Sequence, residues 1–238
     1  MISLVVPTFK EKKNMEKLVE RTGAALAATG DSYELIIVDD NSPDATAGEV
    51  RRLQPGRPWL KLLVRERERG LATAVTAGWK IARGDILGCM DGDLQHPPEH
   101  LSSLFEKIRS SGAQIVVASR YVPEGGVSDW KFRRRIISWT ATSMAFALLP
   151  PRMRQVRDPM SGFFLLRRSV IEGVTLRPMG YKILLEVLAR GRYQTTAEVP
   201  YTFEERAHGG SKMDVTQVWL YFLHLLRISF ATRFRSGS

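Results

Sequence analysis

The feature that most constrains this chain is a regular alternation of short apolar runs and amphipathic segments over its first 121 residues. Each apolar run is about as long as one buried strand, and the segments between them carry apolar residues at helical spacing. This alternation predicts an α/β fold, a doubly wound and mostly parallel sheet with helices on both faces. The runs lie at 2–6, 33–38, 60–64, 86–90 and 115–118, and the helical patterns at 15–26, 47–53, 71–81 and 101–108.

The second half of the chain has a different pattern. Basic residues precede an apolar segment at 136–149, strands are expected at 163–166 and 197–203, and a helix is expected at 183–188. Apolar residues return at helical spacing between 215 and 230. We therefore expect one domain over residues 1–212, including an amphipathic helix at about 132–149, and a C-terminal amphipathic helix and tail over residues 213–238.

Composition limits the compartment and the class of partner. Of the 238 residues, 44% are hydrophobic, which is enough for a sizeable core. The single cysteine, Cys89, excludes an intrachain disulfide, and its apolar surroundings favour a small core residue. A net charge of +10 favours an anionic partner, which is a nucleic acid, an anionic lipid or a phosphorylated substrate. No signal peptide or apolar run of about 18 residues is visible, so we expect a cytoplasmic protein that can lie on a membrane.

An acidic loop follows the apolar run at 86–90. Asp91 and Asp93 flank Gly92, Gln95 adds an amide, and prolines 97 and 98 favour the first turn of a helix. Considered alone, this stretch favours a solvated turn at the Asp-Gly pair over a metal-binding loop. However, two other strands end in polar residues, at 7–11 and 38–40, and parallel strands bring such ends to one edge of the sheet, where ligands bind. Hard oxygen ligands at this edge suit Mg²⁺ or Mn²⁺ held together with substrate phosphates.

Taken together and in order, the motifs resemble those of the inverting glycosyltransferases of the GT-A fold, glycosyltransferase family 2, of the dolichyl- or polyprenyl-phosphate mannose synthase type. Two departures stand out, because Phe9 and Lys10 replace a Tyr-Asn pair and Ala72 replaces a glycine; both blur the nucleotide preference. The matching pieces are 7–11 (PTFKE), 38–44 (VDDNSPD), 70–71 (GL), 84–85 (GD), 90–99 (MDGDLQHPPE), 119–121 (SRY), 158–163 (DPMSGF), and Arg206 and Lys212 around Gly209 and Gly210.

The resemblance implies a set of site residues. Nucleotide-sugar binding would fall to Pro7, Phe9, Glu11, Val38, Asp40, Asp91, Gly92, Asp93, Gln95, Arg206 and Lys212. The metal, Mg²⁺ or Mn²⁺, would be held by Asp91, Asp93 and Gln95, and the acceptor phosphate by Arg120, Arg134 and Ser138, with Asp158 as a further candidate.

Simpler roles compete at several of these positions. Pro7 and Val38 suit packing at strand ends equally well, and Glu11 suits the first turn of a helix. The run 133–135 can be a solvated face, or its register can differ by one residue. For His96 we expect a packing or supporting role, because oxygen ligands already supply the metal site.

The expected reaction is transfer of a mannosyl residue from GDP-mannose to dolichyl or polyprenyl phosphate, with inversion, to give a β-linked product. The nearest alternative is the same chemistry with UDP-glucose or another nucleotide sugar. A basic nucleic-acid-binding module is the alternative from another class, but the sequence has no motif for it and we expect no nucleic-acid partner. The expected location is peripheral, on the cytoplasmic face of a membrane, with a small membrane-anchoring subunit as a candidate partner.

Overall fold

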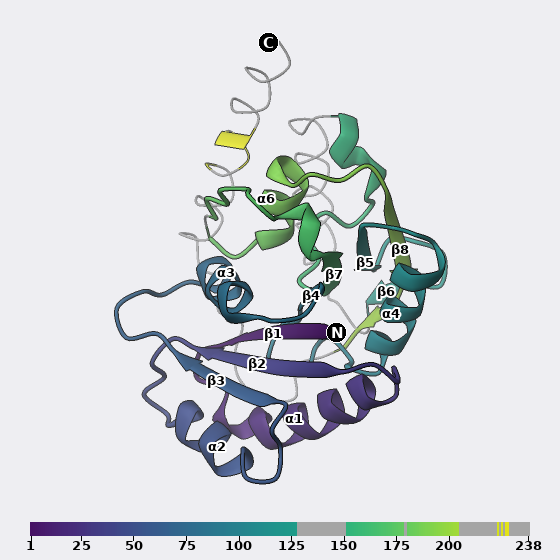
Figure 1. Ribbon diagram of the computed structural model, residues 1–238. Coiled ribbons are helices and arrows are strands. Elements are labelled where there is room, and N and C mark those ends of the chain that lie inside the picture. The colour runs from purple at the N-terminus through teal and green to yellow at the C-terminus, as the bar shows by residue number, and fades with distance from the viewer. Residues whose placement is uncertain (128–150, 179, 205–222, 224, 226, 229–238) are drawn as a thin grey trace.

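A computed structural model describes residues 1–127, 151–178, 180–204, 223, 225, 227 and 228 (Figure 1). Its centre is a seven-stranded sheet with the order β3-β2-β1-β4-β7-β5-β8, in which only β7 runs antiparallel to its neighbours. This confirms the predicted α/β fold with a mostly parallel sheet. The strands are β1 (Ile2–Thr8), β2 (Tyr33–Asp39), β3 (Leu60–Val64), β4 (Ile86–Cys89), β5 (Ile115–Ser119), β7 (Phe164–Arg167) and β8 (Thr196–Pro200).

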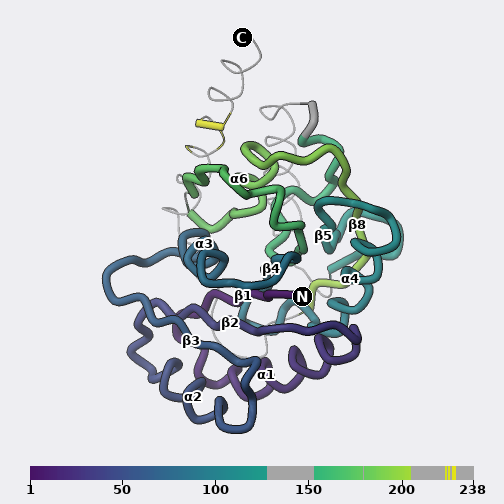
Figure 2. The backbone as a smooth tube through the Cα atoms, in the orientation of Figure 1, coloured from purple at the N-terminus to yellow at the C-terminus, as the bar shows by residue number. Residues whose placement is uncertain are grey.

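The chain begins in the middle of the sheet. From β1 it winds outward through β2 to β3, then returns past β1 to β4, a path that Figure 2 follows along the backbone. Open α/β sheets bind ligands at the carboxyl ends of the strands, where the strand order reverses, and here the order reverses beside β1. The acidic loop follows β4 and therefore lies at this edge of the sheet.

Helices cover both faces of the sheet, and this explains the continuous apolar runs. Every residue of β1 is buried, and so is every residue of β2 after the first. On one face lie α3 (Leu71–Ile81) and α6 (Ile183–Arg190) (Figure 1). On the other lie α1 (Lys12–Ala27), α2 (Thr46–Leu53) and α4 (His100–Ser110). Each face has its own hydrophobic cluster.

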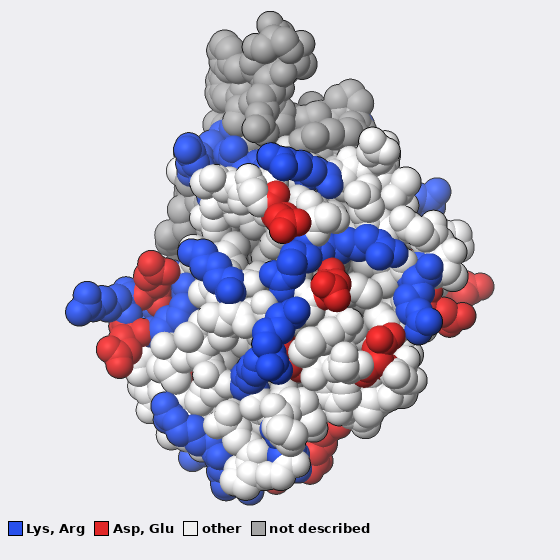
Figure 3. All heavy atoms as spheres, in the orientation of Figure 1, with Lys and Arg blue, Asp and Glu red and all other residues white. Residues whose placement is uncertain are grey.

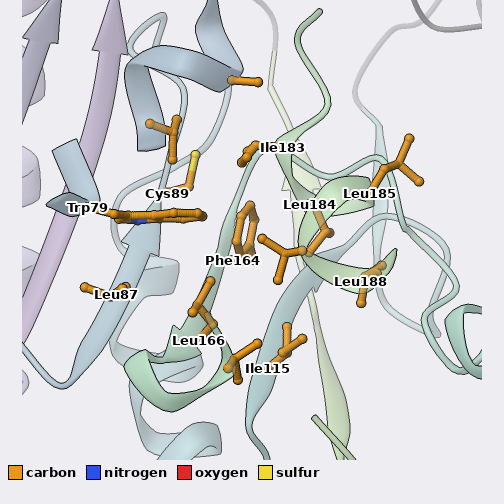
Figure 4. Packing of buried hydrophobic residues seen from close by; sticks show 14 of the residues in the cluster. Trp79, Leu87, Cys89, Ile115, Phe164, Leu166, Ile183, Leu184, Leu185 and Leu188 are labelled. Carbon is orange, nitrogen blue, oxygen red and sulfur yellow. The ribbon is translucent and has the colours of Figure 1, made fainter. Parts of the chain in front are cut away.

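The core beneath α3 and α6 is packed around two aromatic rings. Trp79 meets Phe164 edge-on, with 6.1 Å between ring centroids, and its indole N–H donates to the Gly88 carbonyl at 3.1 Å (Figure 4). Cys89 is buried in the same cluster, as predicted. Helix α3 approaches the sheet closely at Gly78, where an added Cβ would lie 2.5 Å from the Val5 side chain.

One carboxylate is buried inside the sheet. The Glu34 side chain in β2 is fully buried and accepts hydrogen bonds from the Ser3 hydroxyl and the Arg83 main-chain N–H, both at 2.6 Å. Lys61 forms an ion pair with its second oxygen. Burial alone would raise the pKa of Glu34, but these donors outweigh it and lower the pKa to about 2.

The structure differs from the predicted elements at three places. The strand predicted at 197–203 is split: β8 ends at Pro200, and β9 (Thr202–Phe203) pairs with β6 (Gly126–Val127) in a separate sheet. At the break, Tyr201 donates its N–H to Ser119 and accepts from Gly126. Apolar residues alternate with polar ones on both sides of the break, at 197, 199, 201 and 203, so the pattern hides the change of partner. Helix α4 begins at His100, after a turn through the two prolines. Two short 3-10 turns, Pro151–Gln155 and Arg168–Val170, were not predicted.

The expected helix at 132–149 lies outside the described residues, as does most of the predicted C-terminal helix and tail. Of the latter, Leu225 and Ile228 are helical and buried in the cluster beneath α3 and α6, whereas Leu223 is half exposed. At these two positions the apolar stripe therefore packs on the core. Within the described part of the chain, no helix has both the length and the apolar character needed to cross a bilayer.

Candidate active site

Three loops converge at the carboxyl edge of the sheet, after β1, β2 and β4. Their strands are neighbours, with Thr8 paired to Asp39 and Val5 paired to Cys89. Within these loops four residues other than glycine adopt positive φ, namely Lys10 (58°), Asn41 (52°), Ala45 (63°) and Leu94 (63°). Such backbone conformations persist only where the surroundings hold them, and they cluster at functional sites.

Side chains of the second loop shape the first. Asp39 accepts from the Ser42 hydroxyl at 2.6 Å, and that hydroxyl oxygen accepts the main-chain N–H of Lys10 at 2.9 Å. Asp44 accepts from the Thr46 hydroxyl at 2.6 Å. These contacts fix the two loops against each other. The acidic and hydroxyl residues of the 38–44 motif are therefore partly structural.

Asp40 is buried and ties the second loop to the turn before α3. One of its oxygens accepts from Arg65 Nε at 2.7 Å and the other from the Gly70 N–H at 2.8 Å. The Arg65 side chain, only 7% exposed, also donates to the Gly70 carbonyl. Oδ1 also faces Arg65 Nη2, but Oδ2 can accept a second hydrogen bond from a ribose O–H or a base N–H. Arg65 is a partner that the sequence did not reveal.

The other predicted nucleotide residues surround the same loops. Two cations flank the Phe9 ring, with Lys10 Nζ and the Arg69 guanidinium each 5.3 Å from its centroid. Glu11 is buried and accepts from Asn14 at 2.7 Å. Pro7 and Val38 are buried within the sheet, so packing accounts for their side chains.

The polar side chains of the acidic loop differ in their exposure to solvent. The Asp91 side chain is 30% exposed, whereas Asp93 and Gln95 are buried. Asp93 accepts the main-chain N–H of Gln95 at 3.1 Å, and the Gln95 amide nitrogen donates to the Glu204 carbonyl at 3.0 Å. With its nitrogen used in this way, Gln95 retains its amide oxygen as the atom that can meet a cation.

Glycines let the acidic loop lie close to its neighbours. A Cβ at Gly92 would lie 3.1 Å from Thr8 and 3.3 Å from the Pro7 carbonyl. A Cβ at Gly162, before β7, would lie 2.8 Å from Asp91 Oδ2 and 3.0 Å from Oδ1. The loop that carries Gly162 therefore rests directly on the Asp91 carboxylate.

These donors fit a divalent cation of the hard type. Two carboxylates and one amide oxygen are the ligand types that Mg²⁺ and Mn²⁺ accept. Among the described residues, no group of three or more His, Cys, Asp or Glu side chains could hold a metal by itself. Two carboxylates and one amide oxygen suit an ion that takes its remaining ligands from water and substrate phosphates.

His96 is buried beneath the acidic loop and contacts it. Its Nε2 lies 3.3 Å from Asp91 Oδ2, and its ring packs against Phe163, Tyr201 and Phe203 with centroids 5.2–5.5 Å apart. Within the described part of the chain its buried Nδ1 has no hydrogen-bond partner. We therefore assign the ring proton to Nε2, which donates a hydrogen bond to Asp91, and leave Nδ1 unprotonated. This agrees with the predicted packing or supporting role.

Arg120 and Asp158 form a buried, bidentate ion pair on the side of β4 away from β1. Arg120 Nε and Nη2 each lie 2.8 Å from a different Asp158 oxygen, and Asp158 is fully buried. Burial alone would lower the pKa of Arg120, but the Asp158 carboxylate outweighs it and holds the pKa above its usual range. Glu198 accepts the Asp158 N–H at 3.1 Å and so fixes the loop. The structure thus joins two separately predicted residues.

Lys182 is the site residue that sequence reasoning missed. It immediately precedes α6 and donates from Nζ to the Met160 carbonyl at 2.9 Å. Burial and the nearby Arg120 charge lower the pKa of Lys182 to about 8, while Asp91 and Asp158 act in the opposite direction. Only its place at the start of a helix, after the GY pair at 180–181, could have marked it. Of the other predicted residues, Arg134, Ser138, Arg206 and Lys212 lie outside the described residues and stay predictions.

Comparison with known proteins identifies the family of this chain and several similar proteins. The family described as "Glycosyl transferase family 2" matches residues 3–175. The chain is 43% identical over 227 residues to a dolichol-phosphate mannosyltransferase of Pyrococcus furiosus, covering 95% of this chain and 63% of the relative. It is 38% identical to a dolichol-phosphate mannosyltransferase of Saccharomyces cerevisiae, covering 99% of this chain and 89% of the relative. The chain thus spans less than two thirds of the archaeal relative.

Solved structures agree on the fold. A glucosyl-3-phosphoglycerate synthase from Mycobacterium tuberculosis, in complex with Mn²⁺, UDP and glucosyl-3-phosphoglycerate, superposes with a TM-score of 0.69 at 19% identity, covering 98% of this chain and 79% of that one. A mannosyl-3-phosphoglycerate synthase from Rubrobacter xylanophilus gives 0.72 at 17%, covering 100% and 75%. At such identities the likeness concerns the fold alone, the GT-A fold.

Proposed function

Because this chain belongs to glycosyl transferase family 2, we propose that it transfers a mannosyl residue from GDP-mannose to dolichyl or polyprenyl monophosphate. The observation that carries the proposal is 38–43% identity to dolichol-phosphate mannosyltransferases over 95–99% of the chain. The reaction inverts the anomeric carbon and gives a β-linked lipid phosphomannose. The converging loops at the carboxyl edge supply the chemistry that it needs.

Asp91, Asp93 and Gln95 hold Mg²⁺ or Mn²⁺ in this proposal. When bound, the ion neutralises charge that builds on the leaving nucleoside diphosphate. The chain keeps its ligands in place through contacts already described: His96 and Gly162 at Asp91, and the main chain of Gln95 at Asp93. Such surrounding contacts orient ligands and tune metal affinity.

The nucleoside of the donor lies across the first two loops. Asp40 and Glu11 accept hydrogen bonds from ribose hydroxyls or base N–H groups, and Phe9 supplies a stacking surface. The cations beside Phe9 add favourable charge for a nucleotide. Arg206 and Lys212 are proposed to contact the diphosphate.

The acceptor phosphate is the nucleophile. Its second pKa is about 6, so it is largely a dianion near neutral pH and needs no protein base. One of its oxygens bonds to the anomeric carbon from the face opposite the diphosphate, while the bond to the diphosphate breaks and GDP leaves. Positively charged groups of the protein must offset the repulsion between the acceptor phosphate and the donor diphosphate. Arg120, held rigid by Asp158, is proposed to do so together with Arg134 and Ser138.

The lipid acceptor brings the enzyme to a membrane. We propose a peripheral position on the cytoplasmic face, with the apolar segment at 136–149 and its basic flank at the interface. A small membrane-anchoring subunit is a candidate partner.

A basic nucleic-acid module is the weaker alternative. In Figure 3 Lys and Arg form a band across one face, with Asp and Glu among them. Several cations of the protein form ion pairs with its own carboxylates, including Arg21 with Glu99 and Arg52 with Glu49. An interleaved surface of this kind differs from the single-sign stripe that marks a nucleic-acid footprint.

A donor panel tests the proposal. Purified protein, Mn²⁺ and a C55 or dolichyl phosphate are incubated with GDP-mannose, UDP-glucose and other nucleotide sugars, and lipid-linked sugar is measured. We expect product from GDP-mannose, and we expect Asp93→Ala to abolish both transfer and Mn²⁺-dependent donor binding. Asp85→Ala is the matched control, because Asp85 lies just before β4, at the end of the strand opposite the acidic loop, and its side chain is 89% exposed. Preference for UDP-glucose would reassign the donor, and full activity of Asp93→Ala would refute the site.

A further inference from the structure

Lys182 is a cation at the candidate active site, and among the residues that the structure describes it forms no ion pair with a carboxylate. Its Nζ makes one hydrogen bond within the described part of the chain, to the Met160 carbonyl at 2.9 Å. An ammonium group has three N–H donors, so two remain for a ligand. The backbone is well anchored, because the next residue, Ile183, is 1% exposed and packs in the cluster with Cys89 and Phe164 (Figure 4).

Among the residues that the structure describes, Arg120, Asp91 and Asp158 act electrostatically on Lys182. Both Asp158 oxygens are used by Arg120, and Asp91 belongs to the proposed metal site. Neither carboxylate is therefore committed to Lys182. In the proposed site a divalent cation and Arg120 would balance Asp91, Asp93 and Asp158, so the charge of the Lys182 ammonium is left over and favours an anion.

The position of Lys182 indicates which anion. The loops proposed to bind the nucleotide follow β1 and β2, and the acidic loop follows β4. Arg120 follows β5, and the loop of Asp158 and Met160 precedes β7, on the other side of β4 in the strand order. Lys182 is bonded to this second side. Its Nζ therefore lies with Met160 on the side of the site that carries Asp158 and Arg120.

We propose that Lys182 donates to the phosphate monoester of the lipid acceptor, beside Arg120, and so helps to bring the acceptor dianion next to the donor diphosphate. This inference rests on the proposed function. Lysine suits the role because its ammonium is a compact charge with rotatable donors, which adapts to a phosphate oxygen that changes from nucleophile to bridging atom.

Initial rates test the inference when the acceptor phosphate and GDP-mannose are varied separately. Lys182→Met removes the charge and the donors, whereas Lys182→Gln removes the charge and keeps a donor for Met160. We expect both to raise the KM for the acceptor about tenfold or more, the effect of one lost charge-assisted hydrogen bond. The KM for GDP-mannose and the affinity for Mn²⁺ with GDP should stay within about twofold. Lys182→Arg should recover most of the acceptor KM.

Lys107→Met is the matched control, because Lys107 is an exposed lysine on α4 and should behave as wild type. Thermal unfolding shows whether each variant is folded, and if Lys182→Met is not, Lys182→Gln carries the comparison. An unchanged acceptor KM, or a rise confined to the KM for GDP-mannose, overturns the inference. A wild-type protein that transfers no sugar to any lipid phosphate refutes the proposed function instead, so the two failures are distinguishable.

Discussion

Substituting Gly162 by alanine should displace the Asp91 carboxylate while leaving the fold intact. The added Cβ would lie 2.8 Å from Asp91 Oδ2, where ordinary contact begins at 3.4 Å, so that oxygen must retreat by about 0.6 Å. Functional sites tolerate displacements of about 0.5 Å. Because a change in the contacts that orient a ligand typically lowers metal affinity 10–100-fold, we expect Mn²⁺ affinity to fall by about that factor, or about 1.4–2.8 kcal/mol.

Calorimetric titration of Mn²⁺ in the presence of GDP measures the effect, and thermal unfolding shows that the variant is folded. Gly48→Ala is the matched control, because a Cβ there meets only the Ala45 side chain, at 3.8 Å. This control should keep wild-type Mn²⁺ affinity. If Gly162→Ala also keeps wild-type affinity, or loses stability without losing Mn²⁺ affinity, then Gly162 does not support Asp91 and the reasoning is wrong.

Two further predictions concern stability. Asp158→Ala leaves the Arg120 guanidinium buried without its carboxylate, so the free energy of unfolding in urea should fall by about 3–5 kcal/mol, and a loss below about 1 kcal/mol would contradict the assigned ion pair. The pKa of Glu34 is lowered in the folded state, from an ordinary value of 4.5 to about 2, so its contribution is complete above about pH 4.5 and is lost as the pH falls toward 2. That contribution is on the order of 3 kcal/mol. In denaturant titrations the free energy of unfolding of Glu34→Gln should lack this pH dependence. An identical change of unfolding free energy with pH in both proteins would show that other groups cause it.

Much of the first half could be predicted because its signals are local. Strands buried on both faces must be continuously apolar, and for this reason the run at 2–6 falls in β1 and the run at 115–118 in β5. The helical pattern at 71–81 coincides with α3 because apolar residues at that spacing share one helix face. The acidic loop was found by its place after such a strand, and the structure does lay it beside the ends of β1 and β2.

What could not be predicted depends on contacts between distant residues. The apolar run that became β7 looks the same in either direction, so its antiparallel insertion between β4 and β5 left no trace in the pattern. The Arg65 partner of Asp40 lies 25 residues away, and Lys182 lies outside every motif. Both look like ordinary surface cations until the fold buries them. Asp40 and Arg120 were found as motif residues, but the partners that hold them rigid were not assigned to them.

The most direct test of the account is the anomeric configuration of the lipid product, read by NMR after incubation with GDP-mannose, polyprenyl phosphate and Mn²⁺. The account predicts a β-linked phosphomannose, formed only when a divalent cation is present and absent with Asp93→Ala. An α-linked product, or undiminished transfer in a chelator, would contradict a single displacement at a metal site built from Asp91, Asp93 and Gln95.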